Sequence, residues 1–417
     1  MRVLFLNPVG ALGGGERSLL DLARSLAQTA PPIELHLLCG GDGPLAEAAA
    51  QAGMCVHRLP MPEQLARQGD SAARSAGATA RLSRLIGLAR ATASLAGYLR
   101  RCRRLVGELQ PDLIHSNGIK FHLLARWIAG RSPVVWHVRD YVSTRAMVAR
   151  LLRIVARRPA ASIAISRSVR DDLLRILPAA SCTVVYNAID TDHFSPGPAA
   201  VDLDAMAGLS PLPAGAACVR MVLVATYARW KGQDSFIDAV GRLARTRPDL
   251  PIRGYIVGGP IYRTAGSQFS QEELAGLIRA AGVQGQLGLI DFVADPLGVY
   301  RAADIVVHAS SQPEPFGRTI AEAMACGKAV VVSAGGGAAE LIRDGVDAVG
   351  FAPGSAEGLA AALALLAADP DRRAQMGKAA RLAAAERFSR QRLGPEVREV
   401  YQEVLAARPG ELRPQAR

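Results

Sequence analysis

Aromatic residues are scarce in this sequence, since Phe, Trp and Tyr make up 5% of its 417 residues. Surfaces that bind nucleic acid usually combine basic runs with exposed aromatic side chains. The arginines here are instead spread along the chain, although the formal net charge is +12. The composition therefore indicates that nucleic acid is not a partner, while the positive charge still favours a ligand that carries phosphate.

Cysteine is rare as well, and the six cysteines form no CxxC pair. A zinc site or a disulfide framework would need cysteines at regular short spacings. We therefore expect free thiols, most of them buried, and no structural metal. The cysteines are Cys39, Cys55, Cys102, Cys182, Cys218 and Cys326.

Long apolar runs are missing too. The first apolar stretch, Val3–Leu6, is much shorter than the core of a signal peptide. No stretch approaches the roughly 20 apolar residues that cross a bilayer. We expect a cytoplasmic protein, whose basic surface also allows peripheral binding at the inner face of the plasma membrane.

Hydrophobic residues make up half of the chain, and many of them are alanine. The chain is also longer than the roughly 250–300 residues over which a single hydrophobic core keeps growing. Interiors built from Ala, Leu and Val are typical of helices packed on parallel strands. The composition predicts an α/β protein with two domains.

The N-terminal half alternates between strand and helix patterns. Val3–Leu6 is typical of a buried strand, Gly10–Gly15 of a turn, and Leu19, Leu22 and Leu26 of a helix. Repeated units of this kind predict a doubly wound parallel sheet over residues 1–193. Further strands are predicted at 35–38, 112–115, 134–137 and 162–165.

Prolines and glycines interrupt the pattern over residues 194–217, which we interpret as a linker between domains. The alternation then restarts and predicts a second doubly wound domain over 218–392. A C-terminal helix at about 393–410 can cross back to the first domain. Strands of the second domain are predicted at 219–225, 252–257, 288–292, 304–308 and 329–333.

The most informative motif follows the strand predicted at 304–308. Glu314 lies in the loop after this strand, and Glu322 lies about a turn into the next helix. A carboxylate can accept hydrogen bonds from two neighbouring hydroxyls of a sugar, and a helix N-terminus favours a phosphate. The pair therefore suits a ligand that contains both sugar and phosphate.

Pro-Phe-Gly follows Glu314 and Ala-Met-Ala-Cys-Gly follows Glu322, so the segment resembles the E-x7-E signature of retaining glycosyltransferase family 4. The resemblance implies the GT-B fold, with two Rossmann-like domains facing across a cleft. It also implies that Glu322 holds the nucleotide ribose and Glu314 the sugar hydroxyls. Other donor-binding residues expected with them are Phe316, Gly317, Arg318, Gly258 and Phe292.

The segment from Val224 to Asp234 resembles the basic turn that holds the donor diphosphate in this family. Two cations there, Arg229 and Lys231, would stabilise the negative charge of the leaving group. The sequence departs from the family pattern at Thr226, where the family often has arginine. Arg229 can take over that role, which makes Lys231 the firmer assignment.

In the first domain, Gly13–Glu16 resembles the glycine-rich turn of the family, and Gly14, Gly15 and Glu16 are expected to contact an acceptor or a phosphate. The spacing of these glycines does not reproduce the G-x-G-x-x-G motif of dinucleotide-binding proteins.

His137 follows a predicted strand and resembles the cleft histidine of the family, a catalytic candidate that would bind the sugar or the acceptor. Weaker candidates of the same kind are His115, Asn117, Ser166 and the segment 185–190, which we interpret mainly as the approach to the hinge.

Two further segments resemble or suggest functional surfaces. Gly335–Gly337, with Glu340 after it, resembles the loop that closes over the donor. Apolar residues from Leu88 to Val106 form one helical stripe, and arginines lie largely opposite. We expect the stripe to pack on the sheet, so that only the arginine face and the segment 67–90 could contact an anionic membrane.

The leading hypothesis is a retaining glycosyltransferase that needs no metal and acts in bacterial cell-surface polysaccharide or glycolipid synthesis. No cofactor is expected besides the nucleoside diphosphate sugar, with a UDP-sugar first and a GDP-sugar second. The acceptor would be a sugar or a lipid-linked molecule. A non-catalytic protein that binds a nucleotide sugar and a sugar-nucleotide epimerase on the same fold remain as alternatives.

Overall fold

The computed structural model describes residues 1–62, 65, 81–155, 159–213, 215–260 and 266–407, with the side chains of 81–92 left out. The chain divides into two compact units. The first contains Met1–Asn187 together with the C-terminal residues from Arg390, and the second contains Ala188–Ser389. The predicted membrane segment 67–90 lies outside the residues whose side chains are described.

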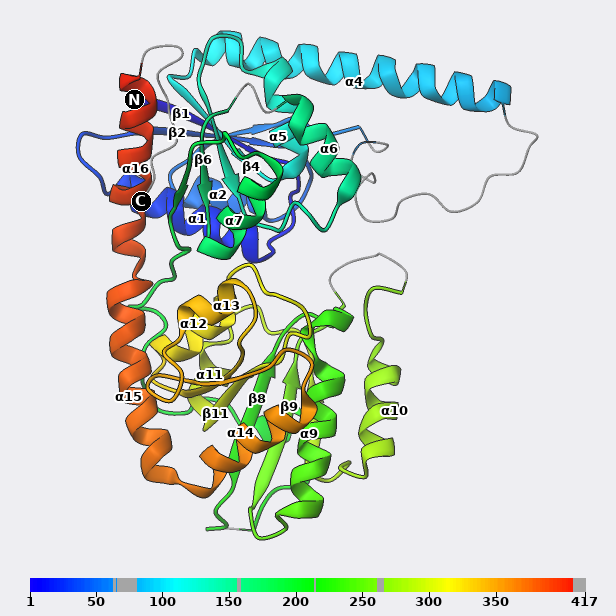
Figure 1. The fold of residues 1–417 in the computed structure, drawn as a ribbon, viewed down its shortest axis with the longest axis vertical. Helices are drawn as coiled ribbons and strands as arrows, with labels where there is room; N and C mark the ends of the chain where they lie inside the picture. The colour runs from blue at the N-terminus through cyan, green and yellow to red at the C-terminus, as the bar shows by residue number, and fades with distance from the viewer. Residues whose placement is uncertain (63–64, 66–80, 156–158, 214, 261–265, 408–417) are drawn as a thin grey trace. The chain divides into compact units, whose positions relative to one another are not determined.

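The first unit contains a seven-stranded sheet in which every neighbouring pair of strands is parallel (Figure 1). The strand order is β3-β2-β1-β4-β5-β6-β7. The strands are β1 (Arg2–Asn7), β2 (Glu34–Cys39), β3 (Cys55–Arg58), β4 (Leu113–Asn117), β5 (Val134–Val138), β6 (Pro159–Ala164) and β7 (Cys182–Val184).

Helices connect these strands and cover the sheet, as a parallel sheet requires because crossovers place helices on its faces. The central strands β1, β4 and β5 are buried along nearly their whole length, and each contains consecutive large apolar residues. The helices are α1 (Gly14–Ala27), α2 (Leu45–Gln51), α4 (Arg81–Leu109), α5 (Ile119–Ile128), α6 (Ala146–Val155), α7 (Arg167–Ile176) and α16 (Arg390–Ala406).

The second unit contains a six-stranded parallel sheet with the order β10-β9-β8-β11-β12-β13. Both sheets reverse their strand order beside the first strand of the unit, which is the pattern of doubly wound folds. The strands are β8 (Val219–Val224), β9 (Ile252–Val257), β10 (Leu287–Ile290), β11 (Ile305–His308), β12 (Ala329–Ser333) and β13 (Val349–Phe351).

The helices of the second unit pack around a core of buried Val, Leu, Ile and Phe side chains. They are α8 (Leu203–Met206), the short 3-10 helix η1 (Arg229–Lys231), α9 (Gln233–Thr246), α10 (Gln271–Ala281), α11 (Leu297–Ala302), α12 (Arg318–Ala325), α13 (Gly337–Leu341), α14 (Ala356–Ala368) and α15 (Pro370–Arg387). Two doubly wound α/β units confirm the predicted fold class.

The division of the chain differs from the linker expected at 194–217. These residues belong to the second unit and contain α8. Asp204 of α8 is buried, where its carboxylate lies 2.6 Å from Arg253 of β9 and accepts a hydrogen bond from Tyr255. The chain instead passes between the units after Asn187 and after Ser389, and α16 then packs against α1 of the first unit.

Candidate functional site

Lys231 lies just beyond the carboxyl end of β8, the central strand of the second sheet. The chain leaves β8, forms the 3-10 turn η1 and enters α9. The ammonium group of Lys231 donates a hydrogen bond to Glu314 Oε2 at 2.6 Å and lies 4.0 Å from the ring centroid of Trp230. The turn therefore directs the cation toward the end of the neighbouring strand, β11.

Glu314 lies in the loop between β11 and α12, and it is buried. Its Oε2 accepts hydrogen bonds from Lys231, from Ser310 Oγ at 3.0 Å and from His308 Nε2 at 3.3 Å. Burial raises the pKa of this carboxyl, but the charge of Lys231 and the hydrogen bond from His308 outweigh burial and hold the pKa well below its usual range. Glu314 is therefore an anion at neutral pH, paired with a cation.

The loop Gly335–Gly337 supports Glu314 through its backbone. Glu314 N donates to Gly335 O at 3.2 Å, and Gly337 N donates to Glu314 O at 2.8 Å. The sequence predicts that this loop closes over a donor. The structure shows that it lies directly against the loop that carries the first glutamate of the signature.

Arg229, the second predicted cation, has different partners from Lys231. Its guanidinium donates to Glu273 Oε1 at 2.5 Å and to Gly266 O at 3.2 Å, and it lies 4.4 Å from the ring centroid of Phe269. The side chain is also largely exposed. The structure therefore brings Lys231 and Glu314 together, whereas Arg229 turns toward α10.

Glu322, the second glutamate of the signature, is buried on α12. Its Oε1 pairs with Arg318 Nε at 2.9 Å, and its Oε2 accepts a hydrogen bond from Tyr300 at 3.0 Å. Burial and the charge of Glu322 raise the pKa of Tyr300 well above its usual value, so the phenol stays a hydrogen-bond donor. A ribose hydroxyl that binds Glu322 would compete with Arg318 or Tyr300 for its oxygens.

The two aromatic residues predicted to bind the donor lie in contrasting places. Phe316 is buried and packs edge-on against Phe388, with ring centroids 5.9 Å apart. Its side chain therefore belongs to the core. Phe292 follows β10 and is 54% exposed, so its ring is open to a ligand.

The two glycines of the donor prediction lie at turns beyond the sheet. Gly317 precedes α12 with φ of +93°, and a Cβ atom there would approach Ile320 Cδ1 to 2.6 Å. Only glycine fits this turn without strain. Gly258 follows β9, and its N–H donates to Ile290 O at 3.0 Å.

In the first unit, the glycine-rich turn leads into α1 at Gly14 and Gly15. The carboxylate of Glu16 accepts a hydrogen bond from Gly13 N at 3.1 Å and lies 3.5 Å from Asn7 Nδ2. Glu16 therefore caps its own helix, a structural use of the side chain that the sequence assigned to ligand binding. Ser166 likewise caps α7 by accepting a hydrogen bond from Val169 N.

His137 lies near the carboxyl end of β5 and His115 lies in the middle of the adjacent strand β4, and both are buried. His115 Nε2 lies 3.0 Å from His137 Nδ1, and Tyr401 of α16 lies 2.6 Å from His115 Nδ1. Arg139 Nη2 lies 3.2 Å from His137 Nδ1. Burial first, and then the charge of Arg139, hold the pKa of both histidines well below the usual value.

These contacts fix the hydrogen positions on the two neutral rings. Arg139 can only donate, so His137 Nδ1 is an acceptor. His115 Nε2 then carries a hydrogen and donates to it, which leaves His115 Nδ1 to accept from the hydroxyl of Tyr401. His137 must carry its hydrogen on Nε2, a buried atom with no hydrogen-bond partner in the structure. The chain of contacts therefore presents His137 as an N–H donor.

Arg139 also connects the ends of several strands. Its guanidinium donates to Asn117 Oδ1 and, at 2.8 Å, to Asn187 Oδ1, while Asn117 Nδ2 donates to Asn7 Oδ1 at 2.6 Å. Arg139 and Asn7 were missing from the sequence-based candidates. Arg139 shares with His137 the position after a buried strand and could have been found by that signal, whereas no pattern pointed to Tyr401.

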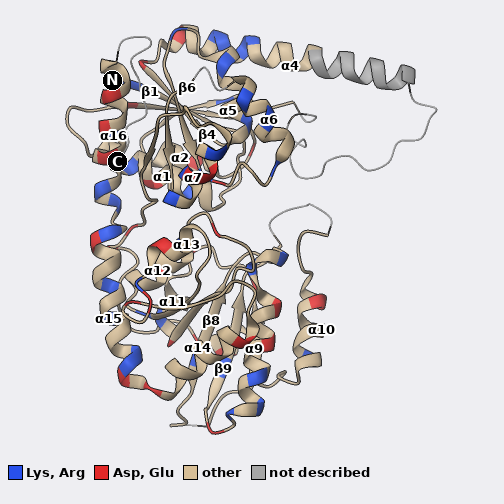
Figure 2. Ribbon diagram, in the orientation of Figure 1, with Lys and Arg blue, Asp and Glu red and all other residues tan. Residues whose placement is uncertain are grey.

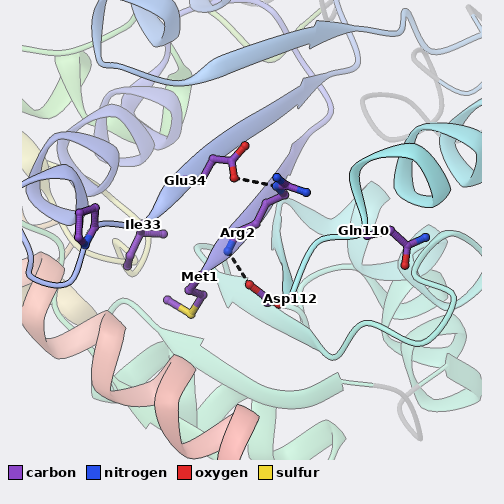
Figure 3. A pocket seen from close by; sticks show the side chains of 7 residues that line it. Met1, Arg2, Ile33, Glu34, Gln110 and Asp112 are labelled. Atoms are coloured by element: carbon purple, nitrogen blue, oxygen red, sulfur yellow. Dashed lines mark hydrogen bonds and ion pairs between the residues drawn. The ribbon is translucent and has the colours of Figure 1, made fainter.

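The pocket in Figure 3 lies away from these residues, at the amino ends of β1 and β2. It has a volume of about 480 Å³ and is lined by residues that include Arg2, Glu34 and Asp112. Arg2 pairs with Glu34 at 2.8 Å, and its backbone N–H donates to Asp112 at 2.7 Å. Ligands of doubly wound sheets bind beyond the carboxyl ends of strands, so we assign no function to this pocket.

Among the residues that the structure describes, no cluster of His, Cys, Asp and Glu could hold a metal ion. Within the same residues, no helix has the length and apolar character needed to cross a membrane.

Two family models match the chain. Residues 12–193 match the model described as Glycosyltransferase Family 4, and residues 219–383 match Glycosyl transferases group 1. Together they cover most of both units.

The names of curated relatives agree with the two family models. The chain is 28% identical to a D-inositol 3-phosphate glycosyltransferase of Arthrobacter sp. over 94% of this chain and 90% of that protein. It is 31% identical to an alpha-maltose-1-phosphate synthase of Mycolicibacterium smegmatis over 59% of this chain and 64% of that protein.

Solved structures show the same fold. Anabaena HepE, crystallised with UDP and glucose, superposes with a TM-score of 0.76 at 23% identity over 96% of this chain and 99% of that chain. Sucrose-phosphate synthase of Thermosynechococcus elongatus superposes with a TM-score of 0.75 at 16% identity over 98% of this chain and 100% of that chain. The two glutamates of the signature, the two parallel sheets and both family models agree with one another. The chain belongs to glycosyltransferase family 4 and is a glycosyltransferase of the GT-B fold.

Proposed function

We propose that the enzyme transfers a sugar from a nucleoside diphosphate sugar to an acceptor hydroxyl with retention of the anomeric configuration. The observation that carries the proposal is the ion pair between the partly buried Lys231 and the buried Glu314 beyond the carboxyl ends of β8 and β11. UDP is the first candidate for the nucleotide and GDP the second, because HepE was crystallised with UDP and with UDP-glucose. A sugar or lipid-linked acceptor of bacterial cell-surface polysaccharide or glycolipid synthesis fits this class of enzyme.

In the proposed reaction, the bond between the anomeric carbon and the diphosphate oxygen breaks, and its electron pair leaves with the diphosphate. The acceptor oxygen forms the new bond to the anomeric carbon from the same face, and its proton passes to the departing diphosphate oxygen. Lys231 stabilises the charge that develops on this leaving group, as a fixed cation in a partly desolvated site does effectively. Glu314 accepts hydrogen bonds from hydroxyls of the transferred sugar. Because the two side chains already hold each other in place, little reorganisation accompanies the reaction.

Arginines on η1 and α12 are the other cations available to the diphosphate. Arg229 would have to leave Glu273 before it could contribute. Arg318 would be released in part if a ribose hydroxyl took its place on Glu322. We therefore assign the main role to Lys231 and a supporting role to the arginines, with no requirement for a divalent metal.

The remaining proposed contacts involve neutral groups. The exposed ring of Phe292 stacks on the base, and the backbone around Gly258 and Gly317 approaches the nucleotide. In the first unit, His137 donates from Nε2 to an oxygen of the acceptor or of the transferred sugar. Gly14 and Gly15 at the start of α1 favour a nearby phosphate or sugar oxygen.

A thermal-shift screen over UDP, GDP, ADP and their sugars tests the donor. We expect one nucleotide and its sugar to raise the melting temperature of the wild type, and EDTA to leave this shift unchanged. Glu314→Ala should lower the shift, whereas Glu357→Ala on the exposed surface of α14 should not. Stabilisation by none of these nucleotides would refute the proposal.

Once a donor is known, the anomeric configuration of the product can be followed by proton NMR. We expect the newly formed linkage to keep the configuration of the donor sugar. A product with the opposite configuration would leave the enzyme a transferase but would overturn the proposed retention.

A further inference from the structure

Helix α6 has apolar side chains on two opposite faces. Ala149, Leu152 and Val155 face the unit and are buried. On the other side, Met147 is 74%, Leu151 42% and Ile154 63% exposed, at the i, i+4 and i+7 spacing of one helix face. Large apolar side chains that gather on one exposed face of a helix usually mark a contact site, and nothing in the described part of the chain covers this face.

The neighbouring helices extend this surface. Trp127 of α5 is 41% exposed. Arg126 beside it donates to Ile154 O on α6 at 3.3 Å, and Arg103 of α4 donates to Trp127 O. These two hydrogen bonds join α4, α5 and α6 into one continuous surface, whose exposed apolar residues we call the α6 face: Trp127, Met147, Leu151 and Ile154.

The surroundings of the α6 face are strongly basic. From residue 113 to residue 155 the sequence contains seven Lys and Arg residues but a single acidic residue, Asp140. Figure 2 shows Lys and Arg along α4 and α5. The exposed arginines on the three helices include Arg100, Arg101, Arg103, Arg104, Arg126, Arg150 and Arg153.

We propose that the α6 face docks on an anionic lipid bilayer, with its apolar side chains inserted between headgroups and the arginines against lipid phosphates. Flexible aliphatic side chains beside an indole and ringed by cations suit the boundary between headgroups and acyl chains. The charge favours an anionic lipid over a neutral one. The inference rests on this surface and not on the proposed donor chemistry, although docking would place the enzyme near a lipid-linked acceptor.

Flotation of the full-length protein with vesicles tests the proposal. We expect the wild type to float with phosphatidylcholine vesicles that contain phosphatidylglycerol, and much less with phosphatidylcholine alone. The triple variant Met147→Ser/Leu151→Ser/Ile154→Ser should bind about tenfold more weakly, because each apolar group buried in the interface contributes to binding. The double variant Arg126→Gln/Arg150→Gln should bind about tenfold more weakly and show a weaker salt dependence.

Matched variants of the second unit serve as controls. Leu382→Ser removes an apolar side chain that is 71% exposed, and Arg242→Gln/Arg279→Gln removes two exposed cations. Both should float like the wild type. Melting temperatures and donor-induced thermal shifts that match the wild type show that the α6-face variants are folded.

Two results would overturn the proposal. One is equal flotation of the wild type with and without phosphatidylglycerol. The other is flotation that the α6-face variants do not change. If those variants instead shifted the sedimentation coefficient of the free protein, the α6 face would be an interface between copies of the chain.

Discussion

At the scale of single residues, the proposed chemistry depends on hydrogen atoms whose positions follow from their neighbours. His137 presents an N–H because Arg139 and His115 both donate to its other nitrogen, and Tyr401 in turn fixes His115. Tyr401 touches neither proposed substrate, so it acts as a positioning residue. Its effect should appear in turnover and not in donor binding.

Tyr401→Phe removes the hydroxyl that donates to His115 and keeps the ring. We expect kcat to fall about tenfold, the cost of one well-aligned hydrogen bond, with the KM for the donor unchanged. Tyr98→Phe, another buried tyrosine of the first unit, is the matched control. Equal kcat for Tyr401→Phe and the wild type would contradict the relay from Tyr401 to His137.

The sequence predicted the positions of the candidate donor residues better than the contacts around them. Lys231 and Glu314 could be predicted because each follows a strongly apolar strand within a recognisable motif. The pairing of Arg229 with Glu273 and of Glu322 with Tyr300 could not, since local spacing contains no information on which distant side chain approaches. Tyr401 lies 286 positions from His115, and only the fold brings them together.

At the scale of elements, the strands inside each sheet and the edge strand β10 could be predicted, whereas the edge strands β3, β7 and β13 could not. β1, β8 and β12 each contain a run of at least three apolar residues. The edge strands β3, β7 and β13 have only three or four residues, and nearly all of these are partly or fully exposed, so they lack the apolar run that marks a buried strand. The region 194–217 was interpreted as a linker because of its prolines, but the ion pair of Asp204 with Arg253 and the hydrogen bond from Tyr255 attach α8 to the second sheet.

Asp204 and Asp202 of this region test that attachment. Asp204→Asn leaves Arg253 buried beside a neutral amide, so unfolding should become easier by about 3 kcal/mol, the lower end of the cost of breaking a buried pair. Asp202→Ala removes only the N-cap of α8 and should cost about 1 kcal/mol. Urea denaturation of both variants measures the difference. Equal small effects would mean that the region does behave as a linker.

The packing of α16 on α1 predicts that a glycine-to-alanine substitution lowers the stability of the protein. Inside most helices the same substitution raises the free energy of unfolding by about 1 kcal/mol. A Cβ atom on Gly394 of α16, however, would lie 2.6 Å from the backbone of Ser25 in α1. Gly394→Ala should therefore destabilise by about 1–3 kcal/mol, whereas Gly97→Ala on α4, with open space around it, should stabilise. A higher urea midpoint for Gly394→Ala would contradict this packing.

At the scale of the whole molecule, buried neutral histidines make stability depend on pH. Burial holds the pKa of His115 and His137 well below the usual value and lowers the pKa of His122 to about 3. The half-buried His57 is shifted in the same direction, mainly by burial. The charged group that faces the first three is Arg139, which adds to the shift.

Because the pKa values are lower in the folded state, the unfolded chain binds more protons below about pH 6.5, where a free histidine titrates. Stability should be constant above that pH and fall as the pH drops from 6.5 toward 5. Glu314 contributes only at lower pH, because a free glutamate titrates near pH 4.3. Urea midpoints measured between pH 8 and pH 5 check this, and a constant midpoint would contradict burial of neutral histidines.

The most direct test of the central claim is release of nucleoside diphosphate from the nucleotide sugar that the thermal-shift screen selects. The wild type should release the diphosphate slowly without an acceptor and faster with one. Lys231→Ala should lower this rate about 10²–10³-fold, as loss of a group that stabilises transition-state charge does, while Lys378→Ala on the exposed surface of α15 should leave it unchanged. A folded Lys231→Ala variant that releases diphosphate at the wild-type rate would contradict the account.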